Sequence, residues 1–342
     1  MRILFDVNHP AHVHFFKNPA RILKDCGHVV MFTSRKKECT EDLLDEFGFS
    51  HRRLSVMDGN GALSLLKELI SRDISLYQTV RKFKPDVMAA IGGTFIAHVG
   101  AVTSIPSVVF YDTENAFLQN IITYPVATRV FVPRCYKAWL PRNAIRYSGY
   151  HELSYLSPNY FVPDISIAKA NGLKPDQNNF LIRIVSWKAS HDLNERGWSR
   201  KLVQKVVEKC LSYGNVIIST EEYLDNALDH LRYRGRASDI HHTMAFCRGF
   251  VGESATMASE CAILGVPAIY AAQTGRGYTD EQEHRYGLVK NVRRLDYAAI
   301  ANAIEDIMER DAEEHRNSRR RLLNDTIDVA RYVAESIEKI AG

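Results

Sequence analysis

The chain has 342 residues, of which 44 are lysine or arginine and 40 are aspartate or glutamate, giving a formal charge of +4. Apolar residues make up 46% and charged residues 25%, which excludes a disordered or fibrous chain. This length predicts two domains, because a single hydrophobic core stops growing at about 250–300 residues. The small charge excess argues against a nucleic-acid-binding protein.

Part of the basic charge lies near the C-terminus, at Arg316 and at 319–321, where a helix would present a solvated face. An anionic membrane surface stays open as a partner of that face. The six cysteines contain no Cys-x-x-Cys pair, which fits a reduced, cytoplasmic protein. We expect neither an export signal nor a membrane span, because the most apolar later run is short and is interrupted by Pro267.

Short apolar runs in the first half alternate with segments of helical period. The runs predict strands at 2–7, 28–34, 86–93, 107–112 and 128–133. Between them, 63–83 has leucines recurring every three or four residues, as in an amphipathic helix. Alternating strands and helices predict a parallel sheet with helices on both faces.

The same alternation restarts after a stretch rich in Pro, Asn and Tyr. Strands are predicted at 180–185, 215–219, 248–252 and 266–271, with long charged helices from Asp296 onward. We therefore predict an α/β protein with two Rossmann-type domains whose parallel sheets face each other across a cleft. The boundaries are 1–152 for the first domain, 153–179 for a linker, 180–325 for the second domain and 326–342 for a C-terminal helix that is expected to pack back on the first domain.

The segment "GFVGESATMASECAILGVPAIY" (249–270) is the most specific one in the chain. It predicts a strand, a turn at Gly252, a helix beginning at Ser254 or Thr256, and a second strand. The free N–H groups at a helix start suit a phosphate. Glu260 lies in an apolar helix and needs a dedicated donor, such as the vicinal hydroxyls of a ribose. The alternative is that Ser254 only caps the helix and Glu260 pairs with a lysine or arginine.

This segment resembles the donor-binding segment of GT-B glycosyltransferases, above all the N-acetylglucosaminyltransferases of peptidoglycan synthesis. The resemblance implies that Ser254 and Thr256 bind the diphosphate of a nucleotide sugar and that Glu260 binds its ribose. The segment 91–117 resembles the acceptor-side loop of those enzymes, which places Gly92, Gly93, Glu114 and Asn115 at the cleft. The segment 279–289 resembles their Gln-containing helix, which places Gln282 near the donor sugar.

Three histidines follow the first strand in "VNHPAHVHFF", where the GT-B enzymes carry a loop with a Gly-His pair. His12 is the aligned position, so the resemblance makes it, with Glu114, a catalytic candidate. A histidine there could act as a general base or stabilise the leaving diphosphate. His9 and His14 are expected to hold the loop at the cleft. The alternative for all three is capping or packing.

The motif "VSWKASHD" (185–192) opens the second domain, and with "PAHVHFFKN" it resembles a prokaryotic family of GT-B-like proteins. Trp187 could stack on a base, Lys188 could contact phosphate, and His191 could pair with Asp192. Of the adjacent His241 and His242, at most one can face the core or the cleft. The histidines match no zinc-binding spacing, so no metal and no cofactor are expected.

These observations predict a metal-independent glycosyltransferase that uses a nucleoside-diphosphate sugar, acting in cell-surface polysaccharide or glycolipid synthesis. A non-hydrolysing nucleotide-sugar 2-epimerase is the first alternative. It is disfavoured because those enzymes carry Gly-Thr-Arg-Pro-Glu after the first strand and Gly-Asp-Thr later, where this chain has "VNHPAH" and "IGGT". A binding protein without catalysis is the second alternative, suggested by the acidic Glu253 beside the phosphate site. The acceptor and the oligomeric state are not specified by the sequence.

Overall fold

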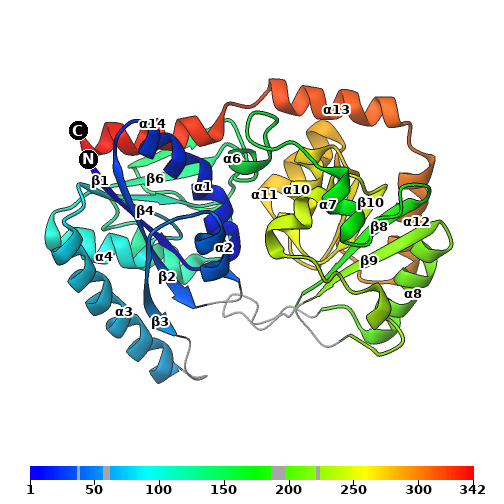
Figure 1. Ribbon diagram of the computed structural model, residues 1–342, viewed down its shortest axis with the longest axis horizontal. Coiled ribbons are helices and arrows are strands. Elements are labelled where there is room, and N and C mark those ends of the chain that lie inside the picture. The colour runs from blue at the N-terminus through cyan, green and yellow to red at the C-terminus, as the bar shows by residue number, and fades with distance from the viewer. Residues whose placement is uncertain (37–38, 57–61, 186–196, 221–223) are drawn as a thin grey trace. The chain divides into compact units, whose positions relative to one another are not determined.

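A computed structural model describes residues 1–36, 39–56, 62–185, 197–220 and 224–342 (Figure 1). The chain divides into two compact units. The first contains Met1–Tyr155 together with Ile327–Gly342, and the second contains Leu156–Thr326. The segment expected to link the domains, 153–179, is thus divided between the units, and its later part forms α7 (Ile165–Ala170) of the second unit.

The first unit contains a seven-stranded sheet in the order β3-β2-β1-β4-β5-β6-β7, with every pair parallel. Its strands are β1 (Arg2–Val7), β2 (Val29–Lys36), β3 (His51–Val56), β4 (Val87–Ile91), β5 (Ser107–Phe110), β6 (Arg129–Pro133) and β7 (Ala144–Tyr147). Its helices are α1 (Pro10–Asp25), α2 (Thr40–Glu46), α3 (Ala62–Phe83), α4 (Thr94–Thr103), α5 (Phe117–Thr123), α6 (Leu153–Leu156, whose last residue falls in the second unit) and α14 (Val329–Ala341).

Helices cover both faces of this sheet. On one face, apolar residues of α3 and α4 pack against β1, β4 and β5 in a single core cluster. On the other face, phenylalanines of the strands stack among themselves and against α1, with Phe5 and Phe16 ring centroids 4.8 Å apart and Phe15 and Phe110 centroids 5.3 Å apart. Such aromatic pairs add directional contacts to the apolar area that they bury.

Helix α1 contains a proline, which removes one hydrogen bond of the helix ladder. Pro19 leaves the carbonyl of Phe15 without its usual partner, and the hydroxyl of Ser154 donates to that carbonyl at 2.5 Å. Asn18 in turn donates to the Ser154 carbonyl at 2.9 Å. The residues just after β7 are therefore fixed to the first unit through α1.

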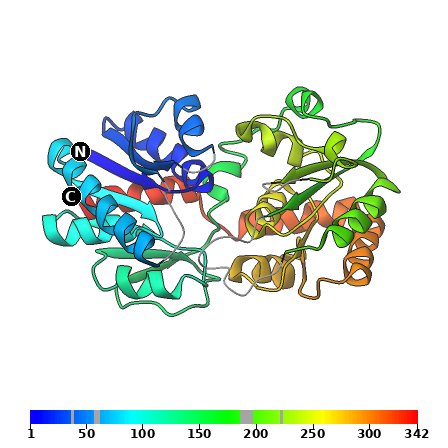
Figure 2. The same ribbon diagram turned by 90° about the horizontal axis from the view of Figure 1, so that it is seen from below.

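The chain ends in the first unit, where both termini lie (Figures 1 and 2). The backbone N–H of Ile327 donates to the Ser148 carbonyl at 2.8 Å, and α14 then packs against α1 and β4. Its buried face includes Val333 and Ile337, both fully inaccessible, and Glu338 bonds the imidazole of His28 at 2.7 Å. The last helix is thus part of the first core.

The second unit contains a five-stranded parallel sheet in the order β12-β11-β10-β8-β9. Its strands are β8 (Asn178–Ile184), β9 (Gly214–Thr220), β10 (Gly249–Gly252), β11 (Ala268–Ala271) and β12 (Val289–Val292). Its further helices are α8 (Arg200–Leu211), α9 (Ile240–Met244), α10 (Ala255–Leu264), α11 (Gly277–Glu281), the π-helix η3 (Gln282–Tyr286), α12 (Tyr297–Glu309) and α13 (Ala312–Asn324), with short 3₁₀ turns at Asp229–Leu231 and Ala237–Asp239. The predicted α/β class with two parallel sheets is confirmed.

One local expectation was wrong. The histidines were placed in a loop after the first strand, but only Asn8 and His9 separate β1 from α1. Pro10 occupies the first helical position, where its fixed φ angle favours a helix and its missing N–H costs nothing. Because the helix begins so early, His12 and His14 lie on α1.

Replacing Ile337 by alanine tests the contribution of α14 to the first core. Large-to-small changes at fully buried positions cost about 2–5 kcal/mol. The free energy of opening measured by amide hydrogen exchange in β1 and β4 should therefore fall by about that amount. Glu335→Ala, at an exposed position of the same helix, should change protection by less than about 0.5 kcal/mol. Unchanged protection of β1 in the Ile337 variant would show that α14 is dispensable for this unit.

Candidate functional site

The strand order of each sheet reverses once, and the reversal marks where ligands bind in open α/β sheets. In the first unit β2 and β4 lie on opposite sides of β1, so the loops after β1 and β4 diverge. In the second unit β9 and β10 flank β8, so the loops after β8 and β10 diverge. His9 and Gly92 follow the first pair of strands, and Ser254 follows β10.

The turn after β10 begins with a close strand contact. A Cβ atom on Gly252 would lie 2.6 Å from the Arg183 carbonyl oxygen, so β10 can approach β8 this closely only with glycine. Ser254 is then the N-cap of α10, and its hydroxyl accepts the N–H of Met257 at 3.2 Å. Thr256 lies in the first turn and is half-buried. Because a helix start has four N–H groups without intrahelical partners, one cap leaves others available to a ligand.

Glu253 lies in the same turn and is 2% exposed. Its carboxylate accepts the backbone N–H of Val185 at 3.1 Å and that of Trp198 at 2.7 Å. Hydrogen bonds of this kind stabilise a buried carboxylate. The charge of Glu253 is therefore satisfied inside the unit, at the point where β8 ends.

Glu260 of α10 is also buried, and the structure identifies a donor for it. The Nε2 atom of His241 lies 3.0 Å from Glu260 Oε1, and the two side chains are 4% and 7% exposed. The neighbouring His242 instead accepts the N–H of Asp164 at 2.9 Å and packs on Phe161. Sequence reasoning expected a lysine, an arginine or a ligand beside Glu260, and a histidine fills part of that role.

Gln282 lies on η3 and is fully buried. Its amide nitrogen donates to the hydroxyl of Ser259 at 2.7 Å, so the side chain is directed at α10. The structure therefore brings Gln282 to the same helix that carries Ser254 and Glu260. Trp187, Lys188 and His191 lie outside the described residues.

In the first unit the three histidines have different surroundings. His9 is the N-cap of α1, and its Nδ1 accepts the N–H of Ala11 at 3.2 Å. His12, half-buried, accepts the N–H of Asn8 on Nδ1 at 3.4 Å. His14 is 6% exposed and packs its ring 5.3 Å from that of Tyr155.

Gly92 and Gly93 follow β4 and allow close backbone packing. Gly92 has a left-handed φ of +67°, which disfavours other residues, and its carbonyl accepts from the Tyr111 hydroxyl at 3.1 Å. A Cβ on Gly93 would lie 2.5 Å from a methyl carbon of Val109. Glu114, after β5, accepts the N–H of Lys137 at 3.4 Å, and Asn115 is exposed.

Sequence reasoning missed an acidic group at this edge of the sheet. Asp112 follows β5, and its carboxylate lies 3.2 Å from Nδ1 of His151, which is 6% exposed. Burial alone would raise the pKa of Asp112, but the charge and hydrogen bond of His151, a bond from Thr113 and the charge of His12 lower it to about 2. His12 and Asp112 are therefore electrostatic neighbours at the carboxyl edge.

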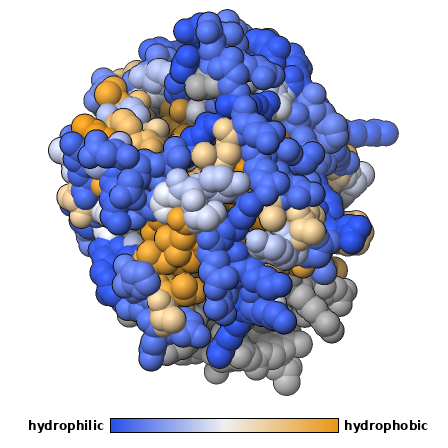
Figure 3. All heavy atoms as spheres, turned by 90° about the vertical axis from the view of Figure 1, so that its right-hand side faces the viewer, coloured by the Kyte–Doolittle hydropathy of each residue, from blue (hydrophilic) through white to orange (hydrophobic). Residues whose placement is uncertain are grey.

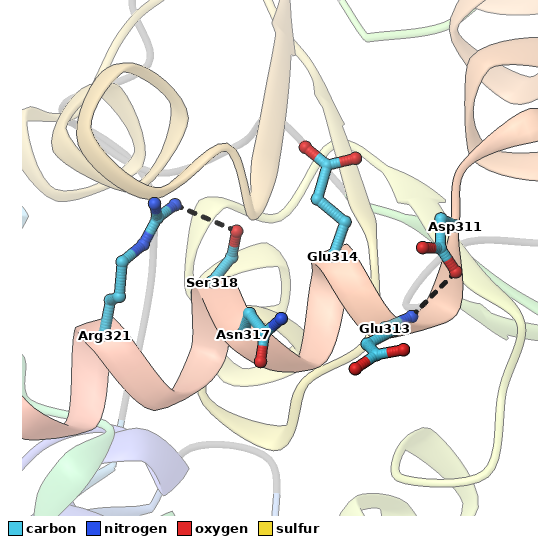
Figure 4. Close-up of a pocket in the computed structure, with 6 residues that line it drawn as sticks. All are labelled: Asp311, Glu313, Glu314, Asn317, Ser318 and Arg321. Carbon is cyan, nitrogen blue, oxygen red and sulfur yellow. Dashed lines mark hydrogen bonds between the residues drawn. The ribbon is translucent and has the colours of Figure 1, made fainter.

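A hollow of about 410 Å³ lies along α13, and none of the residues above lines it (Figure 4). Its lining residues are Asp311, Glu313, Glu314, Asn317, Ser318 and Arg321. Three carboxylates against one guanidinium would repel a diphosphate. Within the described part of the chain, no group of three or more His, Cys, Asp or Glu side chains is arranged to hold a metal ion.

A family model described as "Protein of unknown function (DUF354)" matches residues 1–337. The chain belongs to this family. It is similar to the uncharacterized protein MJ0665 of Methanocaldococcus jannaschii, with 22% identity over 277 residues that cover 78% of this chain and 80% of that protein.

Two solved structures show the fold of this DUF354 member. The UDP-GlcNAc 2-epimerase of Neisseria meningitidis, bound to UDP-GlcNAc, has a TM-score of 0.69 at 14% identity, covering 99% of this chain and 100% of that one. MurG of Acinetobacter baumannii has a TM-score of 0.63 at 13% identity, covering 99% of each chain. The predicted resemblance to the GT-B glycosyltransferase and 2-epimerase superfamily is thus confirmed at the level of the fold.

Asp112→Asn tests the ion pair at this edge. A carboxyl group whose pKa falls from 3.8 to about 2 on folding contributes stability above pH 4 that is lost as the pH falls through 2. The variant should therefore lose about 2 kcal/mol of unfolding free energy at neutral pH and show a flatter pH dependence between pH 4 and 2. Urea unfolding at several pH values measures both quantities.

The exposed Asp25 is the matched control, since Asp25→Asn removes a carboxylate of the same unit without removing a buried ion pair. It should keep the wild-type pH dependence. An Asp112 variant with the wild-type profile would mean that Asp112 and His151 are not ionically paired in solution.

Proposed function

We propose that this chain is a metal-independent glycosyltransferase whose donor is a nucleoside-diphosphate sugar. The observation that supports this most is the capped start of α10 at the order reversal of the second sheet, followed by the buried Glu260 about 9 Å further along the helix axis. The N–H groups and positive dipole end at Ser254 suit a diphosphate. The buried carboxylate of Glu260, which lies 3.0 Å from Nε2 of His241, is the group that we assign to the ribose hydroxyls.

We assign two roles to the first unit: stabilisation of the leaving diphosphate and activation of the attacking hydroxyl. Transfer breaks the bond between sugar C1 and the phosphate oxygen, which keeps the electron pair, and joins the acceptor oxygen to C1. The acceptor proton passes to a base, for which Glu114 is the candidate. Nε2 of His12 carries a proton both in a neutral ring whose Nδ1 accepts the Asn8 N–H and in a ring charged beside Asp112. Either form favours hydrogen-bond donation to the leaving diphosphate over proton abstraction.

A nucleotide-sugar 2-epimerase is the second candidate, and the structural similarity to such an enzyme supports it. The short connection after β1 opposes it, since Asn8 and His9 supply neither the arginine nor the glutamate of that motif. Incubating the protein with UDP-N-acetylglucosamine alone separates the candidates, because only an epimerase inverts C2 without an acceptor. Proton NMR would detect the second isomer.

The structure removes the main support for a binding protein without catalysis. It was suggested by the negative charge of Glu253 beside the phosphate site, but that carboxylate accepts two backbone N–H groups inside the unit. The biological setting that we propose is synthesis of a cell-surface polysaccharide or glycolipid on the cytoplasmic side of the membrane. Of the described helices, none combines the length and apolarity required to cross a bilayer.

The nucleotide site is tested by a donor screen followed by Glu260→Gln. UDP, GDP, dTDP and CMP sugars are screened by thermal shift, since a ligand at 100 times its Kd stabilises by about 2.7 kcal/mol. The variant keeps an acceptor for His241 but loses the charge, so calorimetry should show affinity weaker by about 1.5–3 kcal/mol.

Glu309→Gln, at an exposed position of the same unit, should leave the affinity unchanged. If Glu260→Gln binds the donor as tightly as wild type does, Glu260 has no role in the nucleotide site. If none of the sugars shifts the melting temperature, the donor class itself is wrong.

His12→Ala tests the catalytic assignment. A group that acts in the transition state contributes to turnover and not to ground-state binding. Turnover should therefore fall by about 10²–10⁴-fold, while the affinity for the donor should stay within a few-fold of the wild-type value. His9→Ser keeps a capping residue at the start of α1 and should retain turnover. Near-normal turnover in His12→Ala with loss in His14→Ala would move the catalytic role to His14.

A further inference from the structure

Helix α5 is inverted, with apolar side chains outside and polar ones inside. One face carries the exposed residues Phe117, Leu118, Ile121 and Ile122, at 62%, 79%, 45% and 44% of their full accessibility. The opposite face carries Asn120 and Thr123, which are 2% and 0% exposed. An amphipathic helix of a soluble domain normally buries the apolar face. The outer face of α5 therefore requires an explanation.

Hydrogen bonds prevent α5 from turning this face inward. Asn120 donates to the Tyr136 hydroxyl at 3.2 Å, and the Thr123 hydroxyl lies 2.8 Å from that of Thr94 on α4. A rotation that buried the apolar residues would leave these polar groups without partners, which is costly inside a protein. The apolar face is thus held outward by the core itself.

The exposed apolar surface continues beyond the helix. Trp139, 54% exposed, packs its ring 5.2 Å from that of Tyr124, directly after α5. Val126 is 39% exposed in the same stretch. We call Phe117, Leu118, Ile121, Ile122 and Trp139 together the α5 face. Exposed Trp, Phe and Leu side chains that lie together are typical of surfaces that enter the interface of a bilayer.

The sequence that carries this face is basic, and Glu114, which accepts the Lys137 N–H, comes directly before it. Residues 115–150 contain no aspartate or glutamate and five basic residues: Arg129, Arg134, Lys137, Arg142 and Arg146. Lys137 and Arg142 are exposed on either side of Trp139 in the sequence. The rest of the chain is nearly balanced, so a local excess next to an apolar surface indicates an anionic partner.

The C-terminal arginines suggested by the sequence fit such a partner less well. Arg319 is half-buried and donates to the Ile263 carbonyl at 2.8 Å, and Arg321 bonds Ser318. The hollow along α13 is also lined by three carboxylates, two on the helix and one at its N-cap Asp311 (Figure 4). The face drawn in Figure 3 is mostly hydrophilic, with apolar side chains confined to limited areas.

We propose that the α5 face seats this protein on an anionic lipid bilayer, with Lys137 and Arg142 among the headgroups. The apolar side chains enter the boundary between headgroups and acyl chains, and the cations contribute electrostatic attraction. The contact is peripheral. It is independent of the proposed nucleotide site, which belongs to the second unit, so each proposal fails or succeeds alone.

Co-sedimentation with vesicles tests the proposal. The wild-type protein should bind vesicles of phosphatidylcholine and phosphatidylserine, bind pure phosphatidylcholine vesicles much more weakly, and dissociate as salt rises. Leu118→Glu should weaken binding at least about tenfold. Each basic residue near the membrane surface raises the affinity for anionic vesicles about fivefold. The double variant Lys137→Glu, Arg142→Glu should therefore bind these vesicles at least about 25-fold more weakly.

Matched controls separate this face from general surface effects. Val162→Glu changes an apolar residue that is as exposed as Leu118, at 79%, but lies in the second unit, and it should bind as wild type does. Circular dichroism and the melting temperature of the ligand-free protein should be unchanged in all variants, which shows that the fold persists.

Three results would overturn the proposal. The first is that the wild-type protein fails to bind phosphatidylserine vesicles, and the second is that the α5 variants bind them as tightly as the Val162 control does. The third is that vesicle binding is absent and sedimentation velocity shows a dimer that Leu118→Glu dissociates, which would assign the face to a second copy of this chain.

Discussion

The carboxyl edges of the two parallel sheets are the constraint on which the rest of the structure depends. Parallel strands all point the same way, so every loop that follows a strand leaves from one edge. Each order reversal, at β1 and β4 and at β8 and β10, makes neighbouring loops diverge and leaves room for a ligand. His12 and Ser254 matter because the topology delivers them to these two places.

Buried acidic groups hold the strand ends in position. Asp6, fully buried in β1, lies 2.9 Å from Arg72, and the Arg72 guanidinium also bonds Asn8 just before α1. Glu253 performs the corresponding task at β10 by accepting two backbone N–H groups. An unpaired carboxylate in these positions would be strongly destabilising. Substitutions at them are therefore expected to alter stability and loop position together.

Most of the fold could be predicted from the sequence, because central parallel strands are buried on both faces and read as continuous apolar runs. The unpredicted strands β3, β7 and β12 are all at sheet edges, and β3 reads "HRRLSV". Ser254 and Glu260 were singled out because they share one sequence segment, and Gln282 because of a resemblance; the structure brings Gln282 to α10, where the other two lie. No sequence pattern relates Asp112 to His151, or Glu260 to His241, since only the fold brings these pairs together.

The central claim is that the start of α10 binds the diphosphate of a nucleotide sugar. Hydrogen exchange with and without a saturating donor tests it most directly, because bound phosphate oxygens accept the N–H groups at that helix start. With the donor bound, the amides in 253–260 should exchange more slowly. A donor that binds tightly yet leaves these amides unprotected, or protects those along α13 instead, would contradict it.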